Sequence, residues 1–300
     1  QRGPRPHSPP SMDVPMTQSS QKSLRLGLIG GNIKETRSPV LHTTCGLSIG
    51  RNATYDLIIP AERGLSFAET LAYCAANGFD GVNVTYPYKE EAARLVAAGD
   101  PVVKAMGASN TVKFTADGPR AYNTDHSGFV AAYHKTYGNV LPGRVLLLGT
   151  GGVGRAVAFG LADLHAEEIV MFDMDPSKTG SLAQAVEAYK PVRATPIGQE
   201  VFDDLSGFDG IINCTPLGMV GREGSPLPAG SVVAPRWGFE AVYTPLRTEF
   251  LEHLEASGAK VLNGYELYFH QGIDAFEIFS DATIEAPAWV RSIITHSPEK

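Results

Sequence analysis

The sequence contains only three cysteines among its 300 residues, and they lie far apart. Cys45, Cys74 and Cys214 form no C-x-x-C pair, so the pattern predicts neither a disulfide framework nor a zinc site, and we expect no metal. So few cysteines favour a reducing compartment, and the expectation is a cytoplasmic protein.

Long apolar runs and clusters of basic residues are also missing. No run reaches the roughly 18 to 20 residues that a membrane-spanning helix needs, so we expect no membrane partner. The net charge is −7, which argues against the basic face that nucleic-acid binding requires. The expected partner is a small-molecule substrate, and nothing in the sequence indicates an oligomeric state.

The first 23 residues are rich in Pro, Ser and Gln and lack the apolar region of a secretory signal. We interpret residues 1–23 as a disordered leader. Met12 and Met16 are both candidates for the natural start.

From Leu24 onward, short apolar runs alternate with helical patterns. Strand-like and helical stretches follow one another at residues 24–31, 38–50, 53–61, 64–78 and 79–87. This alternation predicts an α/β fold with a parallel or mostly parallel sheet.

A second block of the same kind begins near His126, and it includes strand-like segments in residues 209–219 and 230–243. The tail from Gly264 is helical and amphipathic. We expect one domain over residues 24–125, a second over 126–263 and a C-terminal helical segment over 264–300.

The stretch VLLLGTGGVGRAVAFG, residues 145–160, places a glycine turn between a short apolar strand and a helix. That context is required of a dinucleotide-binding turn, in which Gly149, Gly151 and Gly154 allow backbone N–H groups to approach a pyrophosphate. Asp173 follows at the end of the next strand, with Asp175 beyond it. A carboxylate at this position accepts hydrogen bonds from the ribose hydroxyls and repels a 2′-phosphate. The pattern therefore favours NAD over NADP.

The stretch GVNVTYPYKEE, residues 81–91, reads as a strand that breaks at Pro87, with Lys89 just beyond. Lys89 is either a solvated residue opening a helix or an amine directed into a cleft. Asp125 is either the N-cap of a helix beginning near Ser127 or a functional carboxylate, and Asn110 is either a turn residue or a functional amide.

Taken together, the chain from Leu24 to about Trp289 closely resembles the shikimate dehydrogenase family, including its quinate/shikimate members. The motifs that carry this resemblance occur in the family's order: TRSP (36–39), NVTYPYK (83–89), ASNT (108–111), NTDHSG (123–128), GTGGVGRA (149–156), NCTPLGM (213–219), VYTPLRT (242–248) and GYELYFHQ (264–271).

The resemblance implies an N-terminal α/β substrate domain, a Rossmann-type doubly wound cofactor domain and a C-terminal helix that returns to the substrate domain. It implies that Lys89 and Asp125 are the catalytic pair. The matching substrate positions are Thr36, Ser38, Thr85, Lys89, Asn110, Asp125, Tyr243 and Gln271. The implied cofactor positions are Gly149, Gly151, Gly152, Val153, Gly154, Asp173, Asp175, Asn213, Cys214, Thr215 and Gly264.

The resemblance also implies the activity: reversible oxidation of shikimate, quinate or both to the 3-dehydro ketone, with NAD as the preferred cofactor and NADP possible. Removing a hydride and a proton from a ring alcohol requires a positioned acid/base, which Lys89 and Asp125 can supply. Hydroxyl and amide side chains suit a polyhydroxylated carboxylate.

Two departures from the family pattern keep alternatives open. Thr36 stands where biosynthetic members usually have serine, so the ligand could be shikimate, quinate or an amino analogue. The stretch Asp173-Met174-Asp175 lacks the arginine of NADP-using members, although Arg155 and Lys178 are nearby cations. An NADP-linked biosynthetic enzyme and a non-catalytic ligand sensor are the competing interpretations.

Overall fold

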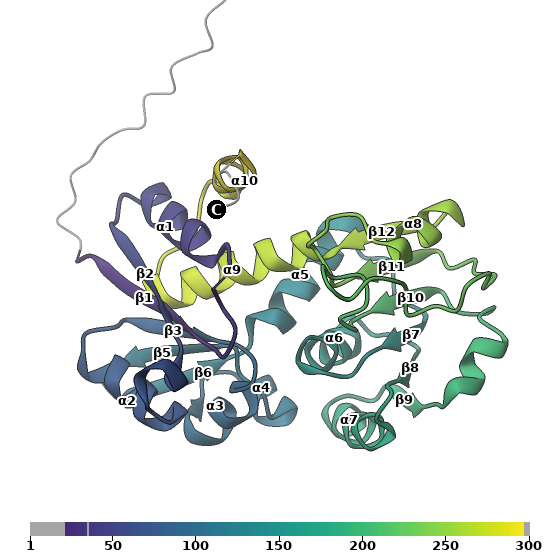
Figure 1. Cartoon of the computed structure of the whole chain (residues 1–300), viewed down its shortest axis with the longest axis horizontal. Coiled ribbons are helices and arrows are strands. Elements are labelled where there is room, and N and C mark those ends of the chain that lie inside the picture. The colour runs from purple at the N-terminus through teal and green to yellow at the C-terminus, as the bar shows by residue number, and fades with distance from the viewer. Residues whose placement is uncertain (1–21, 35, 297–300) are drawn as a thin grey trace, which may run out of the picture.

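The computed structural model describes residues 22–34 and 36–296, so the expected leader lies almost wholly outside the described residues. Two six-stranded sheets stand side by side, each covered by helices (Figure 1). Within the described residues, no helix is both long and apolar enough to cross a membrane.

The first sheet has the strand order β2-β1-β3-β5-β6-β4. Its strands are β1 (Leu24–Ile29), β2 (Ala53–Ile58), β3 (Gly81–Val84), β4 (Ala97–Ala98), β5 (Thr111–Thr115) and β6 (Gly118–Tyr122). The segments between them form α1 (Ser38–Ser48), the 3₁₀ turn η1 (Pro60–Arg63), α2 (Phe67–Ala76), α3 (Lys89–Leu95) and α4 (Pro101–Met106). β1 is parallel to β2 and β3, whereas β5 is antiparallel to both β3 and β6.

The second sheet is parallel throughout, in the order β12-β11-β10-β7-β8-β9. Its strands are β7 (Arg144–Leu148), β8 (Glu168–Phe172), β9 (Arg193–Pro196), β10 (Gly210–Asn213), β11 (Trp237–Glu240) and β12 (Lys260–Asn263). Its helical segments are α6 (Gly152–Asp163), α7 (Pro176–Tyr189), η2 (Gln199–Asp203) and α8 (Glu249–Ala256). The expected doubly wound Rossmann architecture is therefore confirmed.

Two strand expectations in the second block were too long. Of the strand-like segment at 209–219, only Gly210–Asn213 forms a strand. Of the segment at 230–243, only Trp237–Glu240 pairs in the sheet. Pro235 has no backbone N–H to donate to a central ladder, so the strand begins only after it.

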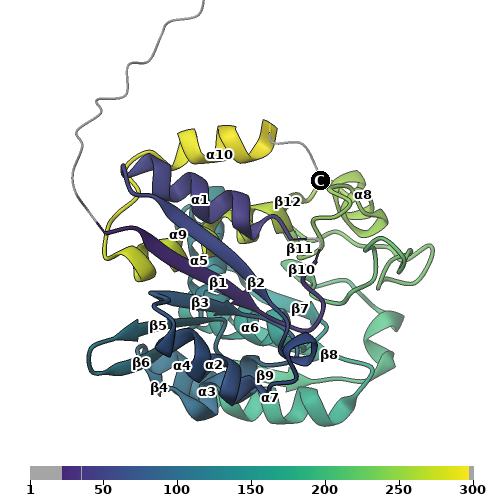
Figure 2. The same cartoon turned by 60° about the vertical axis from the view of Figure 1, so that its left-hand side comes forward.

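Two long helices join the sheets. α5 (Thr124–Tyr137) leads from the first sheet to the second, and the boundary expected after Asp125 falls within its first turn. α9 (Gly264–Ser280) runs back alongside α5 and reaches the first sheet, where Phe279 packs over Gly81. α10 (Pro287–His296) lies beside α1 (Figure 2). The returning C-terminal helix was predicted correctly.

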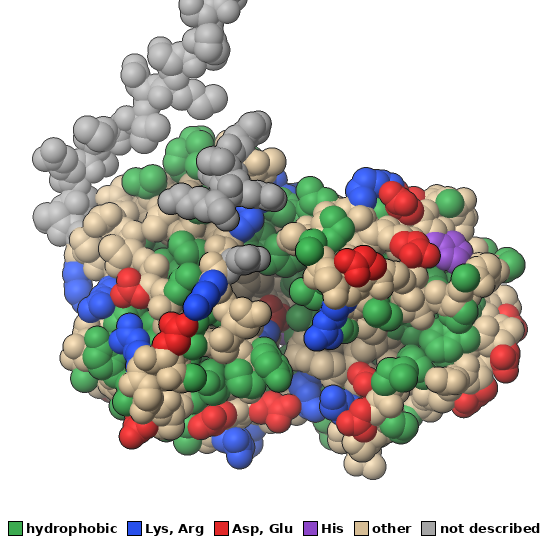
Figure 3. All heavy atoms as spheres, viewed as in Figure 1, with side chains coloured by type: hydrophobic (Ala, Val, Ile, Leu, Met, Phe, Trp, Pro, Cys, Tyr) green, Lys and Arg blue, Asp and Glu red, His purple; other side chains and the backbone are tan. Residues whose placement is uncertain are grey.

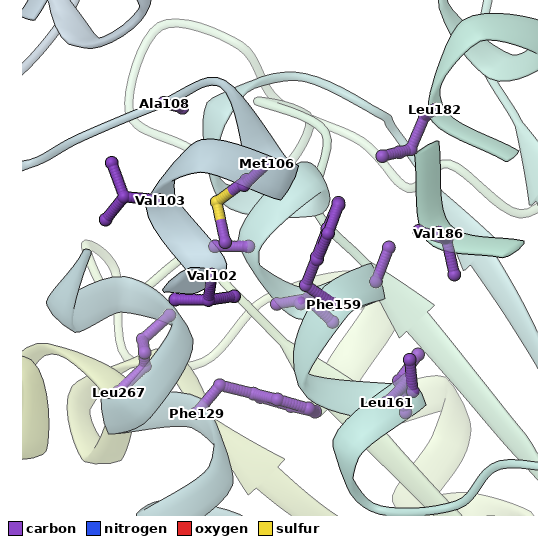
Figure 4. Packing of buried hydrophobic residues seen from close by; sticks show 14 of the residues in the cluster. Val102, Val103, Met106, Ala108, Phe129, Phe159, Leu161, Leu182, Val186 and Leu267 are labelled. Atoms are coloured by element: carbon purple, nitrogen blue, oxygen red, sulfur yellow. The ribbon is translucent and has the colours of Figure 1, made fainter. Parts of the chain in front are cut away.

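The two sheets also share a hydrophobic core on one side of the molecule. Val102 and Met106 of α4 belong to the same buried cluster as Phe159 of α6 and Leu182 of α7 (Figure 4). A fully buried side chain of this kind stabilises the fold by about 1.5–3 kcal/mol. This packing holds the two halves together beneath the cleft that separates them.

Candidate active site

Lys89 and Asp125 form an ion pair at the floor of the cleft. Lys89 is the first residue of α3, and its Nζ donates to Oδ2 of Asp125 over 2.6 Å. The two side chains are only 17% and 12% exposed. Asn123, not Asp125, caps α5, so the interpretation of Asp125 as a helix cap was wrong. Charge-assisted bonds at this distance are strong and fix both groups.

A cavity of about 420 Å³ surrounds this pair, and all eight residues expected at the substrate site line it. They are Thr36, Ser38, Thr85, Lys89, Asn110, Asp125, Tyr243 and Gln271. Figure 3 shows the hollow between the two halves of the molecule. Segments from the start, the middle and the end of the chain therefore meet at one place.

Thr36 and Ser38 form a small hydroxyl turn at the start of α1. The Thr36 hydroxyl donates to Ser38 Oγ over 3.1 Å, and the Ser38 N–H donates back to Thr36 Oγ1 over 3.2 Å. Between them, Arg37 donates to the carbonyl of Ile294 in α10. The C-terminal helix thus braces the loop that carries both hydroxyls.

Asn110 connects the first sheet to the helix that carries Asp125. It is 4% exposed, and its Oδ1 accepts from the Thr124 N–H over 2.7 Å and from the Thr111 hydroxyl over 2.9 Å. Its Nδ2 donates to the Thr124 hydroxyl over 3.1 Å. Asn110 therefore fixes the start of α5 in addition to lining the cavity.

Tyr243 and Gln271 approach the cavity from the second sheet and from α9. The Tyr243 ring stacks on Tyr268 with 5.3 Å between centroids, and Gln271 Nε2 donates to the Tyr268 carbonyl over 2.9 Å. A methyl group at Gly128 would lie 2.7 Å from the Gln271 backbone nitrogen, so only glycine lets α5 and α9 pack this closely.

Sequence reasoning missed three polar lining residues, Asn32, Asn83 and Tyr268. Asn83 accepts from the Tyr55 hydroxyl over 2.8 Å and donates to the Thr111 hydroxyl over 3.1 Å. It lies two residues before Thr85, so the two-residue period of a strand could have identified it. Tyr268 lies three residues before Gln271, which is the spacing of one helix face.

The glycine turn faces Lys89 from the opposite side of the cleft. Gly149 has φ +89° and approaches the backbone of Cys214 so closely that a methyl group there would lie 2.8 Å from it. At Gly154 a methyl group would lie 2.0 Å from the Gly149 carbonyl oxygen, whereas at Gly151 nothing lies within 4 Å. The unpaired N–H groups at the start of α6 therefore open onto free space, which suits a pyrophosphate.

Asp173 follows β8 and lines a second cavity of about 430 Å³. Its Oδ2 accepts from the Thr150 N–H over 2.8 Å, and its Oδ1 accepts from the Asp175 N–H over 3.0 Å. Burial opposes ionisation of Asp173, but these hydrogen bonds, the Thr150 hydroxyl and Lys178 outweigh it and hold its pKa below the ordinary value. This cavity also contains Glu200 and no lysine or arginine.

The remaining expected cofactor residues take several positions. Val153 and Gly264 line the substrate cavity. Asp175 caps α7 by accepting from the Ser177 N–H over 3.1 Å. Asn213 is fully buried and accepts from the Thr215 N–H over 2.9 Å, so its side chain shapes the loop that contains Cys214. Burial and the charge of Glu240 raise the pKa of the Cys214 thiol.

In the described part of the chain, no three His, Cys, Asp or Glu side chains gather in a way that could hold a metal ion. The site brings together an amine–carboxylate pair, hydroxyls, amides and, across the cleft, a glycine turn.

Comparison with known proteins gives the same assignment. Residues 28–112 match the family model described as the shikimate dehydrogenase substrate binding domain. A quinate/shikimate dehydrogenase (NAD(+)) from Corynebacterium efficiens is 32% identical over 271 residues, which cover 86% of this chain and 93% of the relative. A shikimate dehydrogenase (NADP(+)) from Haloarcula marismortui is 35% identical, with 84% and 91% covered.

Solved structures agree. Quinate dehydrogenase from Corynebacterium glutamicum, in complex with NAD, superimposes with a TM-score of 0.86 at 30% identity, covering 92% of this chain and 99% of that one. A shikimate 5-dehydrogenase from Thermus thermophilus, in complex with NADP(H) and shikimate, has a TM-score of 0.79 at 30% identity, covering 91% and 98%. The chain belongs to the shikimate/quinate dehydrogenase family of NAD(P)-dependent oxidoreductases.

Proposed function

We propose that the chain oxidises a secondary ring alcohol of shikimate or quinate to the ketone, reversibly, with NAD as the preferred cofactor. The observation that carries this proposal is the Lys89–Asp125 pair, 2.6 Å apart, in a cavity that faces the glycine turn. In this proposal residues 24–125, with the helices after Gly264, bind the substrate. Residues 126–263 bind the cofactor.

The residues around the glycine turn fit a dinucleotide. The start of α6 offers backbone N–H groups beside open space at Gly151, and the carboxylate of Asp173, which lines the neighbouring cavity, would accept hydrogen bonds from a ribose. When bound, NAD supplies the acceptor for the hydride that leaves the alcohol carbon.

The proton of the substrate hydroxyl is handled by Lys89 and Asp125. As the alcohol becomes a ketone, its O–H proton passes to this pair, and the Lys89 amine stabilises the charge on the oxygen. Asp125 orients the amine, because its carboxylate accepts from Nζ. A positioned acid/base of this kind contributes about 10²–10⁴ in rate.

The hydroxyl and amide groups of the cavity hold the rest of the substrate. Thr36, Ser38 and Tyr243 offer hydroxyl donors for a carboxylate, and Asn110 and Gln271 offer amides for ring hydroxyls. This set favours a ring that carries one carboxylate and several hydroxyl groups.

The preference for NAD rests on the charges near Asp173. A 2′-phosphate would meet Asp173 and Glu200 in a cavity without a lining cation. Arg155 donates to the Met106 carbonyl over 2.9 Å, toward α4, and Lys178 is 58% exposed beside Asp175. Neither provides a built phosphate clamp.

The three cysteines are free, which supports a cytoplasmic, reducing location.

A steady-state panel of shikimate and quinate, each with NAD and with NADP, tests this proposal. We expect turnover with NAD and at least one acid, with kcat/KM about 10² or more above that with NADP. Equal use of the two cofactors would favour the NADP-linked biosynthetic alternative. Binding without turnover in all four combinations would favour a ligand sensor.

A further inference from the structure

Glu240 is a completely buried carboxylate at the end of β11, outside the cavities just described. Its exposure is 0%, and three neutral groups donate to it. Asn213 Nδ2 and the Val242 N–H donate to Oε1 over 2.9 Å and 3.0 Å, and the Thr248 hydroxyl donates to Oε2 over 2.6 Å. Unpaired burial of such a group would be costly, so the fold retains it with every partner in place.

The first partner controls the loop that faces the glycine turn. Asn213 and Glu240 are neighbours in the register of β10 and β11, and Asn213 also donates to the Leu217 carbonyl over 3.1 Å. The loop that follows packs against Gly149 through Cys214, and its Met219 lines the substrate cavity. Through Asn213, Glu240 thus fixes the 213–219 loop, which borders both the glycine turn and the substrate cavity.

The other two partners control the segment that carries Tyr243. Val242 immediately precedes Tyr243, and Thr248 closes this segment as the N-cap of α8. The Thr248 oxygen accepts from the Leu251 N–H over 3.1 Å, so its own proton is directed at Glu240. The loop and the segment also meet directly, because a methyl group at Gly218 would lie 3.1 Å from Thr248 Cγ2.

We propose that Glu240 is a positioning residue, which from one carboxylate fixes both the 213–219 loop facing the cofactor and the 242–248 segment carrying Tyr243. Two segments that approach different ligands share one anchor. Loss of the charge at Glu240 should therefore weaken the use of both ligands together, while the Lys89–Asp125 pair stays intact. This inference rests on the proposed function.

Glu168 provides a matched control in the same sheet. It is also buried, but it lies at the opposite, amino edge, at the start of β8. Arg144 and Arg193 pair with it over 2.7 Å and 3.1 Å. Glu240→Gln and Glu168→Gln make the same chemical change in the same sheet at two different edges.

The experiment measures kcat, both KM values, NADH affinity by fluorescence titration and the urea midpoint for each variant. For Glu240→Gln we expect kcat/KM to fall about tenfold or more, with KM raised for both cofactor and acid, because charge-assisted hydrogen bonds are lost. Glu168→Gln should lower the urea midpoint and leave the kinetic constants within about twofold of the unmodified chain, because its ion pairs lie far from the site.

A rescue pair separates positioning from folding. Thr248→Ser keeps the hydroxyl and should behave like the unmodified chain, whereas Thr248→Val should raise both KM values. Kinetic constants for Glu240→Gln equal to those of the unmodified chain, or a rise in only one KM, would overturn the proposal. Lack of turnover in the unmodified chain would instead refute the proposed function. Even if the unmodified chain shows no turnover, weaker NADH binding by Glu240→Gln would support the positioning role of Glu240. Unchanged NADH binding would overturn that role.

Discussion

A methyl group at Gly152 would lie 3.7 Å from Cδ of Lys89. The first residue of α6 and the lysine that begins α3 therefore face each other across the cleft, and a methyl group would just fit between them. The glycine turn thus lies next to the Lys89–Asp125 pair, as the proposed transfer of a hydride and a proton from one substrate carbon and its oxygen requires.

Gly154→Ala should damage the glycine turn, because its methyl group would lie 2.0 Å from the Gly149 carbonyl oxygen. We expect NADH affinity to fall at least tenfold, with a lower urea midpoint. Gly180→Ala is the control: nothing lies within 4 Å of that position in α7, so it should stabilise the fold by about 0.5–1 kcal/mol. Unchanged NADH affinity in Gly154→Ala would contradict this account of the turn.

Lys89→Ala should lose most of its turnover while still binding the acid, with kcat reduced by about 10²–10⁴. Asp125→Asn should lose a similar amount, because the two groups are hydrogen-bonded to each other. The double variant should be little worse than either single one, since a pair that acts as a unit is not additive. Near-normal kcat at saturating substrate in either single variant would show that the pair is not the acid/base.

Replacing Asp173 by Asn together with Met174 by Arg should narrow or reverse the proposed preference for NAD. The change removes a carboxylate whose pKa lies below its ordinary value and supplies a guanidinium, which can bind a phosphate in bidentate fashion. The measurement is kcat/KM with each cofactor at fixed substrate. A ratio that does not move would place the ribose away from Asp173.

The pH dependence of stability should differ between the two buried glutamates. Burial raises the pKa of Glu240 more than its hydrogen bonds lower it. The folded chain thus holds that proton more tightly than the unfolded chain. The contribution of Glu240 is therefore full below the ordinary glutamate pKa and declines as pH rises through the raised value.

Glu168 should show the opposite sign. Burial opposes ionisation there too, but Arg144, Thr195 and Arg193 outweigh it and lower its pKa. Its contribution to stability is present above the ordinary glutamate pKa and is lost as pH falls through the lowered value. Urea unfolding across a pH series checks both predictions. The free energy of unfolding of Glu240→Gln should rise relative to that of the unmodified chain as pH rises. Glu168→Gln should lose less of its free energy of unfolding than the unmodified chain as pH falls. Parallel profiles in all three proteins would refute both assignments.

The sequence was sufficient to predict the residues that sit at regular positions in motifs. The glycine turn lies between a strand and a helix, so local spacing identified it. For Lys89 the strand end left two interpretations open, and only the resemblance to the family implied a catalytic role. The pairing of Lys89 with Asp125 is different, because it depends on where α5 begins, and Asn123 rather than Asp125 turned out to be the cap.

Residues whose roles depend on long-range packing were harder to predict. Glu240 lies in an apolar strand, and only the register of β10 with β11 brings it to Asn213. Tyr268 lines the cavity because α9 returns to the first sheet, and its spacing from Gln271 is informative only once that return is known. The sequence likewise did not indicate that β5 pairs antiparallel with β3 and β6. A hairpin leaves the alternation of strands and helices along the rest of the chain intact.

The core shared by α4, α6 and α7 has a consequence for modular engineering. The half that contains the glycine turn is not a self-contained unit, because Phe159 and Leu182 lie in the same buried cluster as Val102 and Met106 from the other half. A chimera that grafts this half onto the other half of a relative would expose or mismatch this shared core. Exchanges that transfer α4 together with α6 and α7 should yield more folded protein than exchanges cut at the start of α5.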